Sequence, residues 1–325
     1  MKLQRTLLGA MLMLLLPLGM NAQLNDPRET FSLSAEVEGG TNTDYTWRQS
    51  KKGEKLAGGR MEQGVDVRVR GNVKLYGDKK LSVSLSPFYH FSNRNLRTEW
   101  GAENLGFILP DEHHHYGGSL MVSYNIQALG KPLTLLGVGT GNFSQYGFEN
   151  ASGMVGGMFA VTRNQHTYLG LGAIYLLGTS VTWPLYPLIV YSHKFDDRWS
   201  INCMEVNNYL YYQASPRVKY ALGMEIETDK FYFRPHSHRP VDADARFSTL
   251  NSQLPRKAMF SQVSERFGLF ADIQAAKGLT FNLGAGINVP FYGRLRESGG
   301  HHNYMTLRSD ARPFVKLKVK YSLMR

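Results

Sequence analysis

The feature that most constrains this chain is a one-by-one alternation of apolar and polar residues, repeated in about fourteen short segments. The clearest segment is 65–75, in which every second residue is apolar and most of the others are charged. Its two faces are Val65, Val67, Val69, Val73 and Leu75 against Asp66, Arg68, Arg70, Asn72 and Lys74. Successive side chains of a strand point to opposite faces, so one face suits lipid or a core and the other suits water. The alternation predicts an all-β fold.

The N-terminus has the pattern of a secretory signal. Lys2 and Arg5 precede an apolar run over 7–18, and Ala22 precedes Gln23. A run this short is typical of a cleavable signal peptide and not of a spanning helix. We therefore expect a signal peptide over 1–22 and a mature domain over 23–325.

No stretch after residue 22 approaches the ~20 apolar residues that a spanning helix needs, whereas a strand crosses a membrane with about 9–11 residues. The mature domain is therefore predicted to be a transmembrane antiparallel up-and-down β-barrel of about 12–14 strands in the outer membrane of a Gram-negative bacterium. The alternative is a soluble β-sandwich, which has the same two-residue period. The secretory leader favours the barrel, as does the lack of enough apolar residues for a large soluble core.

The predicted strands are separated by two kinds of connection, which alternate along the chain. They cover 31–39, 62–76, 80–91, 117–128, 132–144, 153–163, 166–177, 186–194, 198–205, 208–214, 217–228, 263–275, 279–290 and 311–323. Short turns rich in Gly, Asn, Asp or Pro are expected at 77–79, 129–131, 163–165, 195–197, 215–216 and 276–278. Longer loops are expected at 40–61, 92–116, 145–152, 178–185, 229–262 and 291–310. Such barrels have short periplasmic turns and longer outer loops, with both termini in the periplasm.

The chain carries a formal charge of +11, which falls to +9 when Lys2 and Arg5 leave with the signal. The cations are spread over strands and loops of a secreted chain, so nucleic acid is not expected as a partner. The expected partners are outer-membrane lipid, lipopolysaccharide phosphates, the barrel-assembly machinery and an unknown small solute. The C-terminus departs from the usual barrel pattern, because Met324 and Arg325 follow Tyr321 and Leu323.

The polar faces of the predicted strands supply the candidate lumen residues. They are Asp66, Arg68, Arg70, Lys74, Lys219, Glu225, Lys316, Lys318 and Lys320. In a wet pore, their surplus of cations predicts a mild anion preference. In a barrel of this size, salt-bridge ladders that fill the interior are an equal alternative.

Seven of the ten histidines fall in predicted outer loops. Imidazole is a common ligand of Zn, Cu, Ni and Fe, so loops that meet at one rim could capture a metal ion or haem. The candidate ligands are His113, His115, His236, His238, His301 and His302. The alternative is that these are ordinary polar loop residues, and no resident cofactor is predicted.

No common enzyme motif is present: the chain lacks a Gly-x-Ser-x-Gly elbow, a His-Glu-x-x-His helix and a P-loop. We therefore do not expect an enzyme. A hydrolase whose site is assembled from scattered strand ends is the remaining alternative of that class.

Residues 185–228 carry a family resemblance. The motifs are Pro187-Leu188-Ile189-Val190-Tyr191, Asp197-Arg198-Trp199-Ser200-Ile201, Tyr211-Tyr212, Ser215-Pro216 and Tyr220-Ala221-Leu222-Gly223. This stretch resembles an uncharacterised Gram-negative outer-membrane barrel family related to the transporters of aromatic-degradation pathways. The resemblance implies an outer-membrane location and a channel, with no catalytic residues.

Two functions follow from these observations. The first is a channel or transporter for a small solute, with lumen-facing Arg and Lys residues that set its selectivity. The second is a plugged structural or ligand-binding barrel whose basic, histidine-bearing outer loops bind a metal, haem or surface glycan.

Overall fold

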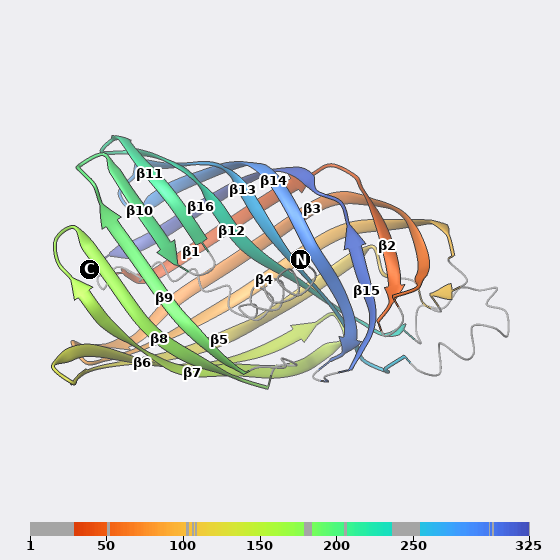
Figure 1. The fold of residues 1–325 in the computed structure, drawn as a ribbon, viewed down its shortest axis with the longest axis horizontal. Helices are drawn as coiled ribbons and strands as arrows, with labels where there is room; N and C mark the ends of the chain where they lie inside the picture. The colour runs from red at the N-terminus through yellow and green to blue at the C-terminus, as the bar shows by residue number, and fades with distance from the viewer. Residues whose placement is uncertain are drawn as a thin grey trace.

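The computed structural model is a single antiparallel β-sheet closed into a barrel (Figure 1). It describes residues 29–50, 53–101, 104–105, 107, 109–178, 184–204, 207–235, 254–298, 300 and 302–324. The predicted signal peptide therefore lies outside the described residues. The strands are β1 (Glu29–Gly40), β2 (Thr43–Gln49), β3 (Lys55–Gly77), β4 (Leu81–Trp100), β5 (Glu112–Ala128), β6 (Lys131–Ser144), β7 (Gly147–Arg163), β8 (Thr167–Leu177), β9 (Leu185–Lys194), β10 (Trp199–Met204), β11 (Asn207–Ser215), β12 (Val218–Phe233), β13 (Ala258–Ala276), β14 (Leu279–Glu297), β15 (Asn303–Ser309) and β16 (Arg312–Met324). Among the described residues, no helix is long and apolar enough to span a membrane.

The barrel has fourteen strands, because two of them are interrupted. β1 and β2 pair with β3 in one continuous register, in which Val37 faces Val67 and Tyr45 faces Gly59. β15 and β16 continue one another in the same way along β14. The first strand pairs with the last through β1–β16 and β2–β15, which closes the barrel. The predicted closed antiparallel barrel of about 12–14 strands is confirmed.

All six predicted short turns join neighbouring strands at the end of the barrel where Glu29 and Met324 also lie (Figure 1). Leu129, Gly130 and Gly278 adopt positive φ angles of 54°, 70° and 80° in two of these turns. Turns of this kind twist in the same sense as the flanking strands. The predicted division of 198–214 into two strands is also confirmed, because β10 and β11 pair as neighbours.

The predicted long loops are wrong in extent, because strands continue into most of them. The range 40–61 contains β2 and the start of β3, 92–116 contains the ends of β4 and β5, and 291–310 contains the end of β14 and all of β15. β-bulges shift the alternation at these places, between Gln63 and Asp66 and between Val263 and Ser264. The shift hides the strand period from a reading of the sequence.

The outer surface of the barrel carries the apolar band expected of a membrane protein. On β5, the outward Leu120 and Val122 lie between Tyr116 and Tyr124, and all four are 38–46% exposed. Similar aromatic residues flank the band on other strands. Near the short turns they are Tyr76, Tyr220, Tyr321, Phe195 and Trp199, and toward the other end they are Tyr89, Phe143 and Phe148. Two aromatic girdles around an apolar band mark this as a transmembrane barrel.

Beyond the second girdle, the barrel narrows into what we call the outer tier. It is formed by β2, β15 and the adjoining ends of β3, β4, β5, β12, β13 and β14, which are eight strands in all. The gap between β12 and β5 is closed by side chains, with Phe231 stacked on His113 at 4.4 Å between ring centroids. Eight strands enclose a space that side chains can fill.

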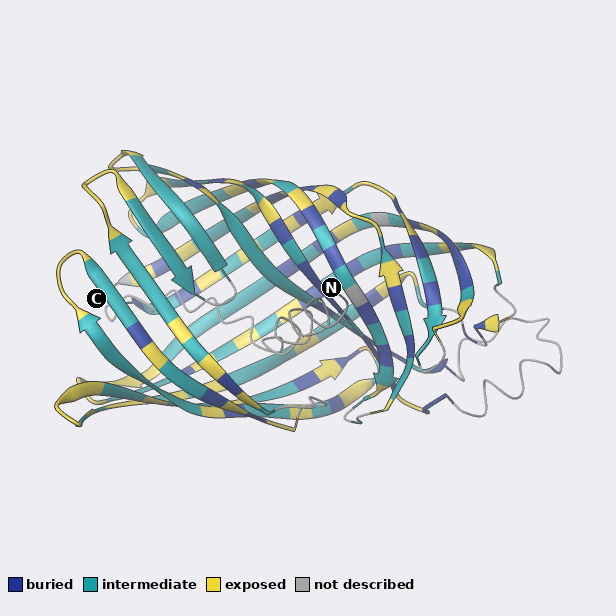
Figure 2. Ribbon diagram, in the orientation of Figure 1, coloured by how far each residue is buried: buried dark blue, intermediate teal, exposed yellow. Residues whose placement is uncertain are grey.

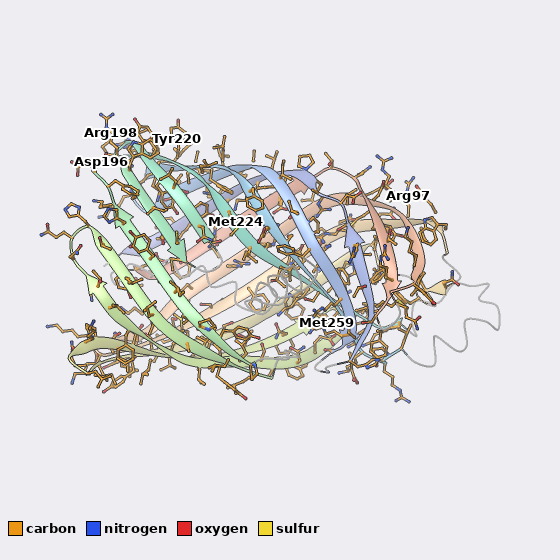
Figure 3. The ribbon with its side chains drawn as sticks, viewed as in Figure 1. Arg97, Asp196, Arg198, Tyr220, Met224 and Met259 are labelled. Atoms are coloured by element: carbon orange, nitrogen blue, oxygen red, sulfur yellow. The ribbon has the colours of Figure 1, made fainter. Side chains whose placement is uncertain are left out.

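The outer tier has the main hydrophobic core of the molecule, visible as buried stretches on β2, β14 and β15 (Figure 2). Trp47, Phe233 and Leu295 are 0–1% exposed there. Its outer surface is polar: Arg97 points away from the barrel (Figure 3) and pairs with Glu62 at 2.9 Å. A charged exterior around an apolar core indicates that this tier stands in water, outside the membrane.

Candidate functional site in the barrel interior

A network of buried ion pairs crosses the barrel interior below the outer tier. Arg68 of β3 donates to Glu36 at 3.0 Å and to Glu38 at 3.2 Å, and across the barrel to Asp229 of β12 at 3.0 Å. Arg94 of β4 joins Asp229 at 2.7 Å to Asp66 at 3.0 Å. β3 and β12 are not neighbours in the sheet, so these bonds span the interior.

Arg266 extends the network to β13, the strand beside β12. It is 1% exposed and lies 2.7 Å from Glu38 and 3.3 Å from Glu227. Because these carboxylates and guanidinium groups are nearly all withdrawn from water, each one depends on its partners for solvation. The network and the core above it fill the axis of the barrel at this end.

The predicted lumen residues differ in whether they belong to this network. Asp66 and Arg68 lie within it, 1% and 5% exposed, and Arg70 lies at its border, 3.9 Å from Glu227. Lys74 is half-buried near the end of β3. The other five lie nearer the short turns, on β12 and β16.

These five residues make a second, looser set of contacts. Lys316 pairs with Glu225, which also accepts a hydrogen bond from Tyr209. Lys219 lies 3.3 Å from Asp272, and Lys320 lies 3.0 Å from Glu29. Lys318 lies opposite Glu36 on β1 and opposite Asn282 on β14.

Six members of the network are not among the predicted lumen residues: Glu36, Glu38, Glu227, Arg94, Asp229 and Arg266. Arg94 and Asp229 fall in ranges predicted as loops, and Arg266 lies early in a predicted strand. Arg94 continues the inward series of Ser92 and His90, which is a signal that the sequence does contain. The ion pairs from Arg68 and Arg94 to Asp229 across the barrel have no such signal in the sequence. They depend on the curvature of the closed sheet, which brings distant strands face to face.

The wall formed by β6 to β9 has an apolar inner face. Met154, Ile174, Leu176 and Tyr186 are 0–4% exposed and pack with Leu136, Val138 and Leu188. Their neighbours along each strand are outward and exposed, as Val155, Tyr175 and Ile189 show. The interior therefore has an apolar wall on one side, and a charged wall of β1, β3, β12, β13 and β16 on the other.

The candidate metal ligands are not brought together in the part of the chain that the structure describes. His113 and His115 lie in β5 and not in a loop, because β5 begins at Glu112. His113 stacks on Phe231, and His115 bonds to Asn142 at 3.1 Å. His302 packs against Tyr304. His236, His238 and His301 lie outside the described residues. Among the residues that are described, no group of three or more His, Cys, Asp or Glu side chains could hold a metal ion.

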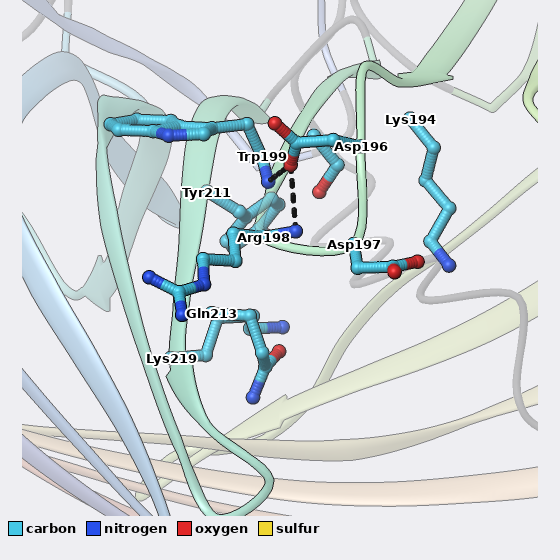
Figure 4. Close-up of a pocket in the computed structure, with 9 residues that line it drawn as sticks. Lys194, Asp196, Asp197, Arg198, Trp199, Tyr211, Gln213 and Lys219 are labelled. Carbon is cyan, nitrogen blue, oxygen red and sulfur yellow. Dashed lines mark hydrogen bonds between the residues drawn. The ribbon is translucent and has the colours of Figure 1, made fainter.

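A small pocket of about 130 Å³ lies at the short-turn end, around the motif Asp197-Arg198-Trp199-Ser200 (Figure 4). Asp196 shapes this turn, because its carboxylate accepts hydrogen bonds from the backbone amides of Trp199 at 2.6 Å and Arg198 at 2.7 Å. These amide bonds lower the pKa of Asp196 below its ordinary value. The pocket is strongly charged, and Lys194, Arg198 and Lys219 are among the residues that line it.

No protein-family model matches the sequence, and none of the curated proteins matches it. Similar folds occur among solved structures, all at low identity. A FadL homologue of Pseudomonas aeruginosa is 10% identical, with coverage of 90% of this chain and 89% of that one and a TM-score of 0.39. An outer-membrane channel of Pseudomonas putida F1 is 10% identical, covering 91% and 96% with a TM-score of 0.42. The toluene transporter TodX of P. putida is 10% identical, covering 91% of each chain with a TM-score of 0.33.

Proposed function

We propose that this protein is an outer-membrane channel for small, largely apolar solutes, with a mild preference for those that carry a negative charge. The observation that carries the proposal is the apolar inner wall of β6 to β9, which contains Met154, Ile174 and Leu176. These side chains are 0–3% exposed, so this wall is apolar and already withdrawn from water. A small apolar solute beside it would meet apolar side chains and would not have to displace hydrated polar groups.

The charged wall supports the preference for anions. Lys316, Lys318 and Lys320 follow one another along the inner face of β16. Glu225 and Glu29 neutralise Lys316 and Lys320, while Lys318 lies opposite Glu36, which Arg68 already binds. Arg70 is 36% exposed, and its ion pair with Glu227 is long, at 3.9 Å. Its charge is therefore only weakly neutralised and adds to the positive potential of the interior.

The path of the solute leaves the barrel axis at the ion-pair network. The strands β8 to β11 are short and end before the outer tier, whereas β12 and β13 continue into it. Asn207 is the end of β11 nearest the tier, and it pairs with Glu225. Among the described residues, no strand pairs with the last eight residues of β12 on that side. We therefore place the outer end of the path at the wall above β8 to β11.

The test is uptake of a small aromatic hydrocarbon into vesicles that hold the refolded mature chain, together with planar-bilayer conductance. Uptake above that of empty vesicles with little steady ion current supports the proposal. Ile174→Asn with Leu188→Asn is expected to lower uptake about thirtyfold, since each change removes roughly 1 kcal/mol of favourable contact. The matched control is Ser192→Asn on the inner face of β9, which should leave uptake unchanged.

A second function, a plugged barrel that acts through its outer tier, is favoured by one observation: the network and the core fill the barrel axis at that end. A folded, heat-modifiable barrel that takes up no solute and carries no current would support it and refute the channel. Capture of a metal or haem by the predicted histidines belongs to this second proposal. Its measurement is Zn²⁺ or haem binding to the whole chain.

A further inference from the structure

The short-turn end of the barrel is strongly basic. Each of its six turns carries at least one exposed Lys or Arg, although turn geometry requires none. These eight residues, which we call the basic ring, are Lys79, Lys80, Lys131, Arg163, Lys194, Arg198, Arg217 and Lys277. The same turns hold three carboxylates, Asp78, Asp196 and Asp197, so their net charge is +5 of the +11 of the whole chain.

The cations of the basic ring form no ion pair with the described residues. None of their side-chain nitrogen atoms lies within 4.0 Å of a described carboxylate oxygen. Two of the three acids are engaged elsewhere. Asp78 accepts from the backbone amides of Lys80 and Leu81, each at 2.7 Å, and Asp196 accepts from those of Arg198 and Trp199.

The basic ring lies directly beyond the aromatic girdle of the same end. Phe195 and Trp199 are 58% and 42% exposed and stand in the same turn as Lys194 and Arg198. Figure 3 shows Arg198 and Tyr220 at this end of the barrel, where Tyr220 is 51% exposed. Aromatic side chains of a girdle sit at the headgroup level of the bilayer, so cations just beyond them are at the level of lipid phosphates.

We infer that the basic ring is a binding surface for the phosphate groups of anionic phospholipids in the leaflet that faces the short turns. With the termini at this end, that leaflet is the periplasmic one. Basic residues near an anionic surface each add to its attraction, and the effect decays within a Debye length. A flat ring spread over six turns matches a lipid surface better than it matches the compact epitope of one protein.

The experiment is native mass spectrometry of the full mature chain released from nanodiscs of equal phosphatidylglycerol and phosphatidylcholine. The wild type is expected to retain phosphatidylglycerol with at least about threefold preference, and 0.5 M salt should remove it. The variant Lys79→Gln/Lys80→Gln/Arg217→Gln/Lys277→Gln is expected to lose the preference. Heat-modifiability on gels shows whether each variant is folded.

The matched control removes four exposed cations at the opposite end: Lys55→Gln, Arg60→Gln, Arg256→Gln and Arg308→Gln. It should retain the lipid preference of the wild type. If the control variant lost the phosphatidylglycerol preference equally, the preference would depend on overall charge and not on the basic ring, and the inference would be refuted. A wild type with no preference at low salt would also refute it and leave an acidic periplasmic protein as the occupant of the ring. The salt series on the wild type decides the question if the turn variant fails to fold.

Discussion

The buried ion-pair network offers the sharpest test of how this barrel is stabilised. Arg266 lies 2.7 Å from Glu38, both are 1% exposed, and Arg266 is also 3.3 Å from Glu227. Replacing one partner of a buried pair leaves an uncompensated charge, which costs about 3–5 kcal/mol. The variant Arg266→Met should therefore lose about 3–5 kcal/mol of the free energy of unfolding.

The assay is urea unfolding from phosphatidylcholine vesicles, followed by tryptophan fluorescence. The control is Arg97→Met in the pair with Glu62, whose side chains are 67% and 31% exposed. An exposed pair of this kind contributes at most about 1 kcal/mol. The loss in the double variant Arg266→Met/Glu38→Gln should be smaller than the sum of the losses in the two single variants, because both changes remove the same ion pair. A loss below about 1 kcal/mol for Arg266→Met, or a loss equal to that of Arg97→Met, would refute the reasoning.

Three further predictions concern the strands, the turns and the depth of the barrel in the membrane. A methyl group on Gly286 would lie 2.0 Å from the carbonyl oxygen of Phe267, whereas one on Gly137 meets nothing within 4 Å. Gly286→Ala should therefore lower the unfolding midpoint clearly and Gly137→Ala should not, and equal midpoints would count against the packing described here. Because the pKa of Asp196 is lowered, its carboxylate stabilises the turn at pH values above the ordinary Asp pKa. This stabilisation is lost as the pH falls through the lowered pKa. An NMR titration in which Asp196 has an ordinary pKa would contradict this. In single-tryptophan variants, brominated lipid should quench Trp199 of the girdle and leave Trp47 of the outer tier, which is 1% exposed, unquenched; quenching of Trp47 would place the tier in the bilayer.

The strands that cross the membrane could be predicted from the sequence, because lipid on one side and a polar interior on the other impose a strict two-residue period. β16 is an example, with Val315, Leu317 and Val319 between its lysines. The outer tier could not be predicted, because water lies outside it and an apolar core inside. There the period is inverted, and the bulges near Gly64 and Phe291 separate the two patterns.

The chemistry of the interior was only partly predictable, for a related reason. The alternation identifies Asp66 and Arg68 as inward residues, but not that Arg68 reaches Asp229, 161 positions along the chain. Whether an inward charge lines an open space or is neutralised by a distant strand depends on the curvature of the closed sheet. His113 and His115 show the same limit, since only the length of β5 decides whether they lie in a strand or a loop.

The closing seam has a consequence for how the molecule forms. Along it, Phe31 faces Leu323 and Tyr45 faces Ser309, so the two edges that must meet belong to opposite ends of the chain. Contacts of such long sequence separation gain no energy until nearly all of the chain is ordered, and chains dominated by them fold slowly. Until then both edge strands expose unpaired backbone groups, to which another chain could add a strand. The seam is thus the place where assembly is slowest and where a chaperone that shields strand edges would have the greatest effect.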